Sequence, residues 1–288
     1  MNRFKHLFPV EKVAKVFKVS KSSYYYWQGQ QVGKWEQTNE PIIRQIRSIH
    51  DKSKQTYGSP RISQELRKQG CFVSVPRVGR LMRKAGIRSV LRKKFVRTTD
   101  STTTKRRFEN LLDRNFVPGL LGRVWVSDIT YIATQQGWSY LTTIIDLGDR
   151  KVIGWNLSRS LQASDTVLPA WKAAVAARPI TGPMIFHSDQ GVQYGCDAFV
   201  TEVSKGNLVI QSMSRKGNCW DNAVAESFFK TLKCEWTNRF VYRNIKQAEL
   251  SVFEYIESFY NTKRAHSSLD FLSPDEFAAQ QLTKTNAA

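Results

Sequence analysis

The succession of apolar runs between residues 124 and 213 constrains the fold of this chain most strongly. Five runs have the length and the β-branched content of strands, and two segments with helical spacing lie among the later ones. The predicted strands are 124–133, 138–147, 151–158, 183–188 and 208–213, and the predicted helices are 164–177 and 196–206. Short turns join the first three strands, so these strands form an antiparallel meander, and the later strands alternate with helices. We therefore predict an α/β domain.

This order of elements is the one expected of an RNase H-like fold. It places Asp128 in the middle of the first strand, Asp189 at the end of the fourth strand and Glu226 on a helix after the fifth. Asp128 interrupts an otherwise mostly apolar stripe, and a lone inward carboxylate is costly unless a cation meets it. For Asp128 alone, a hydrogen bond to neighbouring backbone is the commoner explanation. With all three elements considered, we expect the carboxylates to meet at one edge of the sheet.

The predicted helix over 218–237 presents a mixed polar face. At 100° per residue, that face carries Asn222, Glu226, Lys230 and Lys233, while Val224, Phe228 and Leu232 lie on the other side. Together, an amide, a carboxylate and two ammonium groups can bind a metal ion and phosphate groups. The aromatic residues of this segment are expected in the core rather than stacked on bases: Trp220, Phe228, Phe229 and Trp236.

Carboxylates from separate elements suggest a site for hard divalent ions. Mg²⁺ prefers oxygen ligands and keeps several waters, so a few carboxylates and substrate phosphates complete its shell. Two such ions can activate an attacking oxygen and stabilise a leaving one. Asp146 is a competing carboxylate, with a turn-capping role as the stronger interpretation. His187 and Gln190 flank Asp189 and could contact DNA, orient that carboxylate or simply pack.

Several stretches resemble the motifs of transposases of the insertion-sequence-three family, which share a D-D-E catalytic core with retroviral integrases. The motifs are HSDQGVQY, SMSRKGNCWDNAVAESFFKTLKCE, YNTKRAHSSLDFLSPDEF, WVSDITYI and DRKVIGW. The resemblance implies that Asp128, Asp189 and Glu226 are catalytic and hold two Mg²⁺ or Mn²⁺ ions. It implies DNA cleavage and strand transfer at element ends through circularised intermediates. It also implies a downstream-frame product that acts as a frameshift fusion to a short upstream-frame partner, as a homo-oligomer on DNA.

The positive charge is confined to the first third of the chain. Residues 1–107 hold 26 Lys and Arg against 6 Asp and Glu, whereas residues 108–288 hold 18 of each sign. A polybasic segment joined to a neutral core indicates that the protein binds an acidic polymer. We expect the basic segment to hold this polymer and the core to act on it. We expect the polymer to be double-stranded DNA, both at the element ends and at the target. A basic face that serves only solubility is the alternative.

We divide the chain into five regions, in order: a helical hairpin or helix-turn-helix with linker (1–39), a helix-turn-helix-like DNA-binding domain (40–90), a basic linker (91–107), the catalytic core (108–249) and a helical extension (250–288). The small all-α regions therefore precede the core. Within the first region, the two short helices of 10–28 suit either half of a DNA reader or a plain hairpin.

Basic residues in three places are candidate DNA contacts. They are Arg77, Arg80, Arg83 and Lys84 on a predicted helix, Arg92, Lys93 and Lys94 in the linker, and Lys230 and Lys233 with Asn222 beside Glu226. Arg264 and His266 in the extension either contact DNA or brace the core.

Some classes are disfavoured by the sequence. Its apolar runs are too short to span a membrane, and its start lacks the apolar core of a secretion signal, so we expect a cytoplasmic, nucleoid-associated prokaryotic protein. The four cysteines are scattered and suggest free thiols rather than a zinc knuckle. Two alternatives to a transposase stay open: an RNase H-fold nuclease without joining activity, and a transposase-derived DNA-binding regulator with an inert core.

Overall fold

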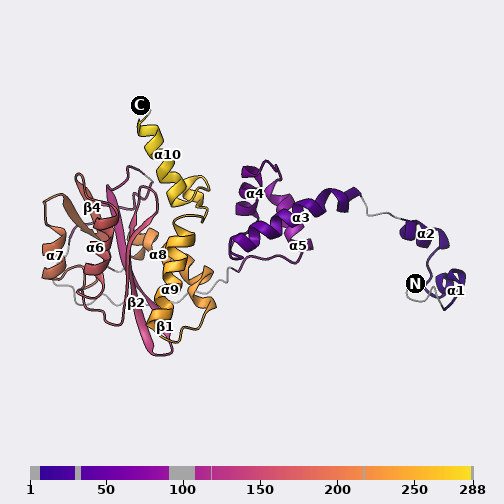
Figure 1. The fold of residues 1–288 in the computed structure, drawn as a ribbon, viewed down its shortest axis with the longest axis horizontal. Helices are drawn as coiled ribbons and strands as arrows, with labels where there is room; N and C mark the ends of the chain where they lie inside the picture. Colours follow the sequence, from indigo (N-terminus) through magenta and orange to yellow (C-terminus); the bar gives the residue numbers. More distant parts are fainter. Residues whose placement is uncertain (1–6, 30–33, 91–107, 118, 217, 287–288) are drawn as a thin grey trace. The chain divides into compact units, whose positions relative to one another are not determined.

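The structure, a computed structural model, describes residues 7–29, 34–90, 108–117, 119–216 and 218–286. The chain divides into two compact units, Met1–Arg88 and Ser89–Ala288 (Figure 1). The predicted basic linker 91–107, with Arg92, Lys93 and Lys94, lies outside the described residues.

The first unit is entirely helical. Its helices are α1 (Val10–Val16), α2 (Lys21–Gly29), α3 (Lys34–Lys52), α4 (Ser59–Lys68) and α5 (Val75–Lys84). Ser20 caps the start of α2, because its hydroxyl accepts a hydrogen bond from the Ser23 amide at 3.0 Å. Proline stands in the first turn of both α4 and α5, where a missing amide hydrogen costs nothing.

Helices α3, α4 and α5 share an apolar core. Ile46, Ile62, Leu66 and Val78 are fully buried, and they come from all three helices. The Ser63 hydroxyl donates to the Val73 carbonyl at 2.6 Å and so ties α4 to the segment before α5. The polar side of α5 is left at the surface.

The second unit contains one mixed sheet of five strands in the order β3-β2-β1-β4-β5. The strands are β1 (Val124–Thr134), β2 (Gly137–Asp146), β3 (Val152–Ser158), β4 (Met184–Ser188) and β5 (Val209–Met213). The first three pair antiparallel as the predicted meander, and β4 and β5 run parallel to β1. This is the RNase H-like arrangement, and all five strands lie within a residue or two of their predicted positions.

Helices cover both faces of this sheet (Figure 1). On one face, Trp125, Phe186 and Met213 pack with α6 (Val167–Ala177) and α7 (Asp197–Val203) in an aromatic-rich core. On the other face, α8 (Ala223–Glu235) packs against β1, and α9 (Ile245–Tyr255) packs against β1 and β3. Since side chains alternate along a strand, Asp128 faces α8 while Trp125 and Ser127 face the opposite way.

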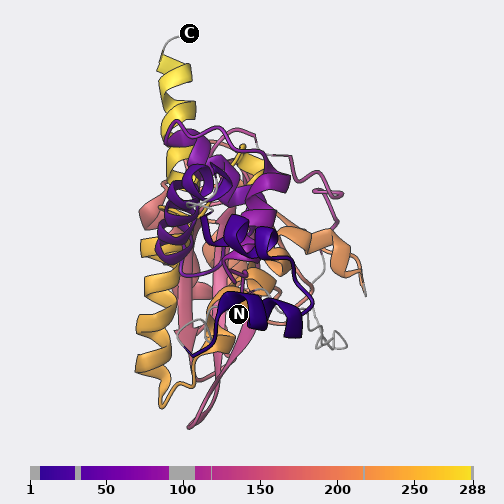
Figure 2. The ribbon, with the colours of Figure 1, turned by 90° about the vertical axis from the view of Figure 1, so that its right-hand side faces the viewer.

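The C-terminal elements brace this second face. A π-helical turn (Ile256–Tyr260) extends α9, and α10 (Pro274–Asn286) leads away from the sheet toward the C-terminus (Figures 1 and 2). The start of α10 is a capping box, because the Ser273 amide donates to Glu276 Oε2 at 2.8 Å and the Glu276 amide donates back to Ser273 Oγ at 3.2 Å. Among the described residues, no helix is long and apolar enough to cross a membrane.

Candidate active site

The sheet register brings Asp128 and Asp189 together. The last pair between β1 and β4 is Val126 with His187, and Asp128 and Asp189 each lie two residues further along, on the same face. Neighbouring strands are about 4.8 Å apart, so the two side chains are adjacent at the point where β4 ends. Each carboxylate is oriented by local backbone: Asp128 Oδ1 accepts from the Ile129 amide at 2.8 Å, and Asp189 Oδ1 accepts from the Gly191 amide at 2.9 Å.

Both carboxylates lie where ionisation is unfavourable. Burial raises the pKa of Asp128 well above its usual range, and the neighbouring Asp189 raises it further. Burial also raises the pKa of Asp189, against the hydrogen bond from Gly191. Two carboxylates in this position need either a proton or a cation between them. The pair is therefore primed for a positively charged ligand.

Helix α8 adds a third carboxylate beside the pair. Glu226 lies in its first turn, on the sheet face that carries Asp128, and its side chain is exposed. Its charge is among those that raise the pKa of Asp128, and partial burial raises the pKa of Glu226 itself. Within the described ranges, no three His, Cys, Asp or Glu side chains already stand close enough to hold one metal ion. Asp128 and Asp189 are the assembled part of the site, and Glu226 flanks them.

Family models match both units of the chain. An HTH-like domain matches residues 36–95, and two integrase core domain models match residues 121–219 and 208–274. The insertion element IS600 31 kDa protein of Shigella sonnei is 36% identical over 265 residues, which cover 92% of this chain and 97% of that protein. The transposase InsF for insertion sequence IS3A of Escherichia coli (strain K12) is 35% identical over 279 residues, 96% of each chain.

The chain belongs to the IS3 family of insertion-sequence transposases. It is accordingly a DDE-type polynucleotidyl transferase with an integrase core and a helix-turn-helix-like DNA-binding domain. Cores of this kind depend in general on divalent metal ions. Neither the joining-deficient nuclease nor the inert regulator is favoured by this membership.

Asn222 does not lie on the exposed polar face of the transposase's helix α8, where we expected it. It is only 3% exposed and precedes the helix, and its Nδ2 donates to the Ser127 carbonyl at 2.9 Å. The amide thus links α8 to β1 and is buried, whereas the Glu226 side chain is exposed. The helical wheel failed here because the residues before Ala223 form a 3-10 turn, Cys219–Asn222, in which the spacing differs from 100°.

The two lysines of α8 differ in exposure. Lys230 is exposed, and Lys233 is half-buried. Burial lowers the pKa of Lys233, while the charge of Asp128 raises it, so this ammonium group lies within electrostatic reach of Asp128. Lys233 is therefore the cation that the structure places nearest the site on this helix, and it partly offsets the repulsion there.

His187 is buried, and its ring forms hydrogen bonds with two serines among the described residues. Its side chain is fully buried, with Nδ1 2.9 Å from Ser212 Oγ and Nε2 3.1 Å from Ser214 Oγ. Burial lowers the pKa of His187 to about 4, so the ring is neutral near pH 7. Burial favours the packing interpretation of His187 over contact with DNA, and its role in orienting Asp189 stays a prediction. Gln190 is half-buried beside Asp189.

Asp146 has the structural role that we favoured. Its carboxylate pairs with Arg178 and accepts from the Gly122 amide at 2.6 Å and the Gly148 amide at 2.8 Å. It lies opposite Trp125 in the register and so points to the face away from Asp128. Arg178 also contacts Asp149 at 2.7 Å. Asp146 therefore closes the turn after β2 and is separate from the carboxylate pair.

Arg264 and His266 brace the core rather than face outward. Arg264 is 5% exposed and makes two hydrogen bonds, of 2.7 and 2.8 Å, to Glu235 at the end of α8. His266 is also buried, with its ring 4.7 Å from that of Tyr260. The bracing interpretation is confirmed, and the extension thereby anchors the helix that carries Glu226.

Trp220 is the one aromatic residue of this segment that the prediction misplaced. Phe228, Phe229 and Trp236 are buried as expected, but Trp220 is 68% exposed on the turn before α8. Sequence reasoning also missed Asp221, which is buried beside it. Asp221 accepts from Arg114 Nε at 2.9 Å and Arg215 Nε at 2.8 Å, a partnership without periodic spacing.

The basic residues of α5 divide into two groups. Arg80, Arg83 and Lys84 are exposed on one side of the helix. Arg77 is half-buried, and its Nη2 donates to Asn39 Oδ1 on α3 at 3.0 Å. Arg77 thus contributes to packing within the helical unit, whereas the other three present their charge to solvent.

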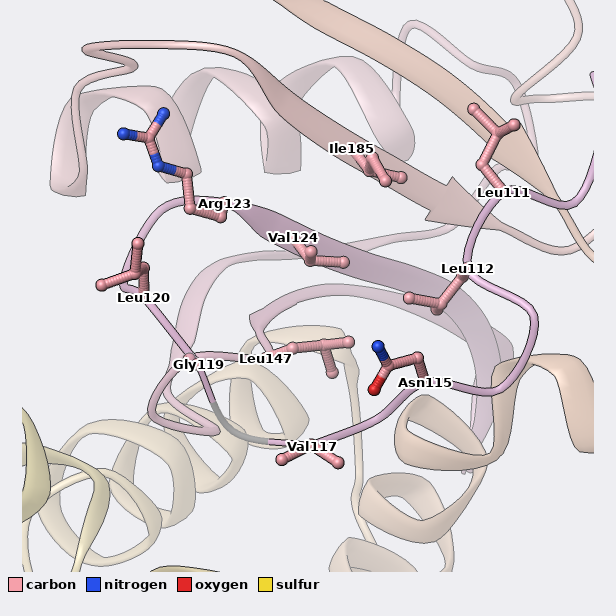
Figure 3. A pocket seen from close by; sticks show the side chains of 11 residues that line it. Leu111, Leu112, Asn115, Val117, Gly119, Leu120, Arg123, Val124, Leu147 and Ile185 are labelled. Carbon is pink, nitrogen blue, oxygen red and sulfur yellow. The ribbon is translucent and has the colours of Figure 1, made fainter.

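A pocket in the core domain lies away from the carboxylates (Figure 3). Its lining combines Leu112, Asn115 and Leu120 from the segment before β1 with Val124, Leu147 and Ile185 at the start of the sheet. Among the described residues, no candidate site residue lines it.

Proposed function

We propose that Asp128, Asp189 and Glu226 are the catalytic carboxylates of this transposase and hold two divalent ions, Mg²⁺ or Mn²⁺. The observation that carries the proposal is the register that puts Asp128 level with Asp189, with Glu226 on the helix packed against the same strand. Asp189 and Glu226 both raise the pKa of Asp128, which supports the proposal that the three carboxylates lie near one another.

The surrounding residues fit hydrated ions. All three proposed ligands offer carboxylate oxygens, which hard divalent ions prefer. Two buried oxygens, Thr143 Oγ1 and Asn222 Oδ1, have no hydrogen-bond partner among the described residues. Thr143 lies directly opposite Asp128, and Asn222 is bonded to the neighbouring Ser127. Since ion-bound waters are strong donors, a hydrated ion beside Asp128 would supply donors in this region.

The reaction supported by this site is cleavage followed by strand transfer. Water attacks a phosphodiester at the element end, one P–O bond forms as another breaks, and a 3′-hydroxyl is released. That hydroxyl attacks a second phosphodiester, again forming one P–O bond and breaking one. Bound divalent ions supply activation of the attacking oxygen and stabilisation of the leaving one. The protein orients the carboxylates through the Ile129 and Gly191 amides and offers Lys230 and Lys233 to phosphates.

Double-stranded DNA at the element ends and at the target is the proposed substrate. Arg80, Arg83 and Lys84 offer exposed charge on α5 for backbone contacts, and Trp220 offers an exposed ring on the turn before α8. We extend the family's route to this chain: circularised element intermediates, fusion to the upstream-frame partner by frameshifting, and a homo-oligomer on DNA. These steps account for how one site processes two ends.

Strand transfer by carboxylate variants tests the assignment. Labelled element-end DNA and a target duplex are incubated with Mg²⁺ and with Asp128→Asn, Asp189→Asn, Glu226→Gln or a control, Glu249→Gln, an exposed residue on α9. We expect no joined product from the first three and wild-type joining from the control, with DNA binding retained by all. Normal joining by any of the three variants would refute the assignment, and cleaved ends without joined product from the wild type would favour a nuclease.

A further inference from the structure

Ser127, the residue before Asp128, receives hydrogen bonds from both of the other segments that carry the proposed carboxylates. Its Oγ lies 2.8 Å from the Tyr194 hydroxyl, and its carbonyl oxygen lies 2.9 Å from Asn222 Nδ2. Ser127 is fully buried. We infer that a clamp formed by Ser127, Tyr194 and Asn222 aligns Asp128, Asp189 and Glu226 for ion binding. This inference rests on the function proposed for these carboxylates.

The direction of the Tyr194 bond follows from the other contact of Ser127. Ser127 Oγ donates its only proton to the Thr143 carbonyl at 2.9 Å, since a carbonyl cannot donate. Tyr194 must therefore donate to Ser127. Burial also raises the pKa of Tyr194 well above its usual range, so its hydroxyl keeps the proton. The result is a fixed chain of two bonds from Tyr194 through Ser127 to β2.

Tyr194 is in turn fixed to the turn that carries Asp189. The Gly191 amide donates to Asp189 Oδ1 at 2.9 Å, and the Tyr194 amide donates to the Gly191 carbonyl at 3.1 Å. The Tyr194 ring packs at 5.7 Å from that of Phe199 in the core beneath. A single short turn therefore runs from the carboxylate of Asp189 to the bond with Ser127.

Asn222 fixes the start of α8 to Ser127, as Tyr194 fixes the turn that carries Asp189. The ladder between β1 and β4 ends at Val126 and His187, immediately before Ser127, and the Asn222 amide bonds to β1 at that point. Glu226 lies four residues further on, one helical turn into α8. Asp221, the preceding residue, is held by Arg215 and Arg114, so the start of α8 is fixed on both sides.

Alignment matters because Mg²⁺ tolerates little error in ligand geometry. It requires near-octahedral coordination at about 2.0–2.1 Å from each oxygen. Groups that orient metal ligands typically change metal affinity about 10–100-fold when removed. Loss of a clamp bond should consequently appear as a higher ion requirement, whereas loss of an ordinary buried hydrogen bond should affect folding stability alone.

The chain contains a matched pair of tyrosine–serine bonds for the test. Tyr194→Phe removes the hydroxyl bonded to Ser127, and Tyr242→Phe removes the hydroxyl 3.1 Å from Ser251 Oγ, in another buried tyrosine remote from the carboxylates. Asn222→Ala removes the hydrogen bond between the start of α8 and Ser127. It tests the clamp independently if Tyr194→Phe does not fold. Each protein is measured in full length for thermal stability, for Mn²⁺ binding without DNA by calorimetry, and for the Mg²⁺ concentration giving half-maximal strand transfer.

We expect Tyr194→Phe and Asn222→Ala to weaken Mn²⁺ binding and to raise the Mg²⁺ requirement about tenfold or more. Tyr242→Phe should match the wild type in both measurements while losing comparable thermal stability. Wild-type ion binding by Tyr194→Phe and Asn222→Ala would overturn the clamp. If Asp128→Asn is inactive in that same experiment, only the clamp fails; if Asp128→Asn binds Mn²⁺ and joins DNA normally, the proposed function itself fails.

Discussion

Removing Arg264 should destabilise the core domain more than any other single charge deletion in the C-terminal extension. Arg264 and Glu235 are 6% and 1% exposed at their side chains and pair at 2.7 Å. Tyr255 adds a hydrogen bond of 3.0 Å to Glu235 Oε2. Arg264→Met keeps most of the side-chain length but leaves the Glu235 carboxylate buried without its cation.

The expected cost follows from the asymmetry of buried ion pairs. Deleting one partner of such a pair destabilises a protein by about 3–5 kcal/mol, because the remaining charge is desolvated and unpaired. In a domain of this size, each 1 kcal/mol lowers the melting temperature by about 2–4 °C. Arg264→Met should therefore lower the melting temperature of the core by roughly 6–20 °C in scanning calorimetry.

The double variant Arg264→Met with Glu235→Gln separates the lost pair from the stranded charge. A neutral amide can still accept from Tyr255, so the double variant should regain at least half of the loss. A loss below about 1 kcal/mol for Arg264→Met, or a double variant as unstable as the sum of the two single variants, would contradict the reasoning.

Four further outcomes are expected. Gly191→Ala should abolish most strand transfer with a small change in stability, because a Cβ there lies 2.9 Å from Asp189 Oδ1; Gly119→Ala, whose Cβ meets nothing closer than 4.0 Å, should be active, and equal activity of the two would count against the turn. Asp221→Asn should reduce the loss of stability at acid pH, measured by urea unfolding over a range of pH. Arg215 lowers the pKa of Asp221, so the stabilisation by this ion pair is present above pH about 4 and is lost as pH falls. The same loss of stability at acid pH in the variant and the wild type would argue against this role of Asp221. Trp220→Ala should weaken binding of labelled element-end DNA by at least several-fold in anisotropy titrations, and unchanged binding would remove Trp220 from the DNA surface. Arg80→Ala and Arg83→Ala should each reduce the slope of log affinity against log salt by about 1, while a slope identical to wild type would mean that α5 does not contact phosphate.

The strands and the carboxylate positions followed from the sequence because they rest on periodicity and order. Alternating apolar residues defined β1, and three consecutive strands with short turns left one reasonable pairing. That pairing put Asp128 on one face, and Asp189 then fell level with it at the end of a parallel strand. In this part of the chain, local pattern and tertiary structure agree.

The residues that hold the site in place could not be found in this way. Asn222 lies in a 3-10 turn, where helical spacing does not apply, and Tyr194 bonds to Ser127 across 67 positions of sequence. The expectation that Trp220 lies in the core was wrong, because hydropathy alone does not tell whether an aromatic side chain in a turn is covered by other elements. Side-chain partnerships between distant loops depend on the assembled fold and have no sequence periodicity.

Anomalous scattering from Mn²⁺ in crystals of the full-length protein would test the central claim most directly. The account predicts strong anomalous peaks within about 2.0–2.3 Å of carboxylate oxygens from Asp128 and Asp189, with Glu226 completing the site, and loss of these peaks in Asp128→Asn. Mn²⁺ bound only elsewhere, or three carboxylates that stay apart in saturating Mn²⁺ and element-end DNA, would contradict it.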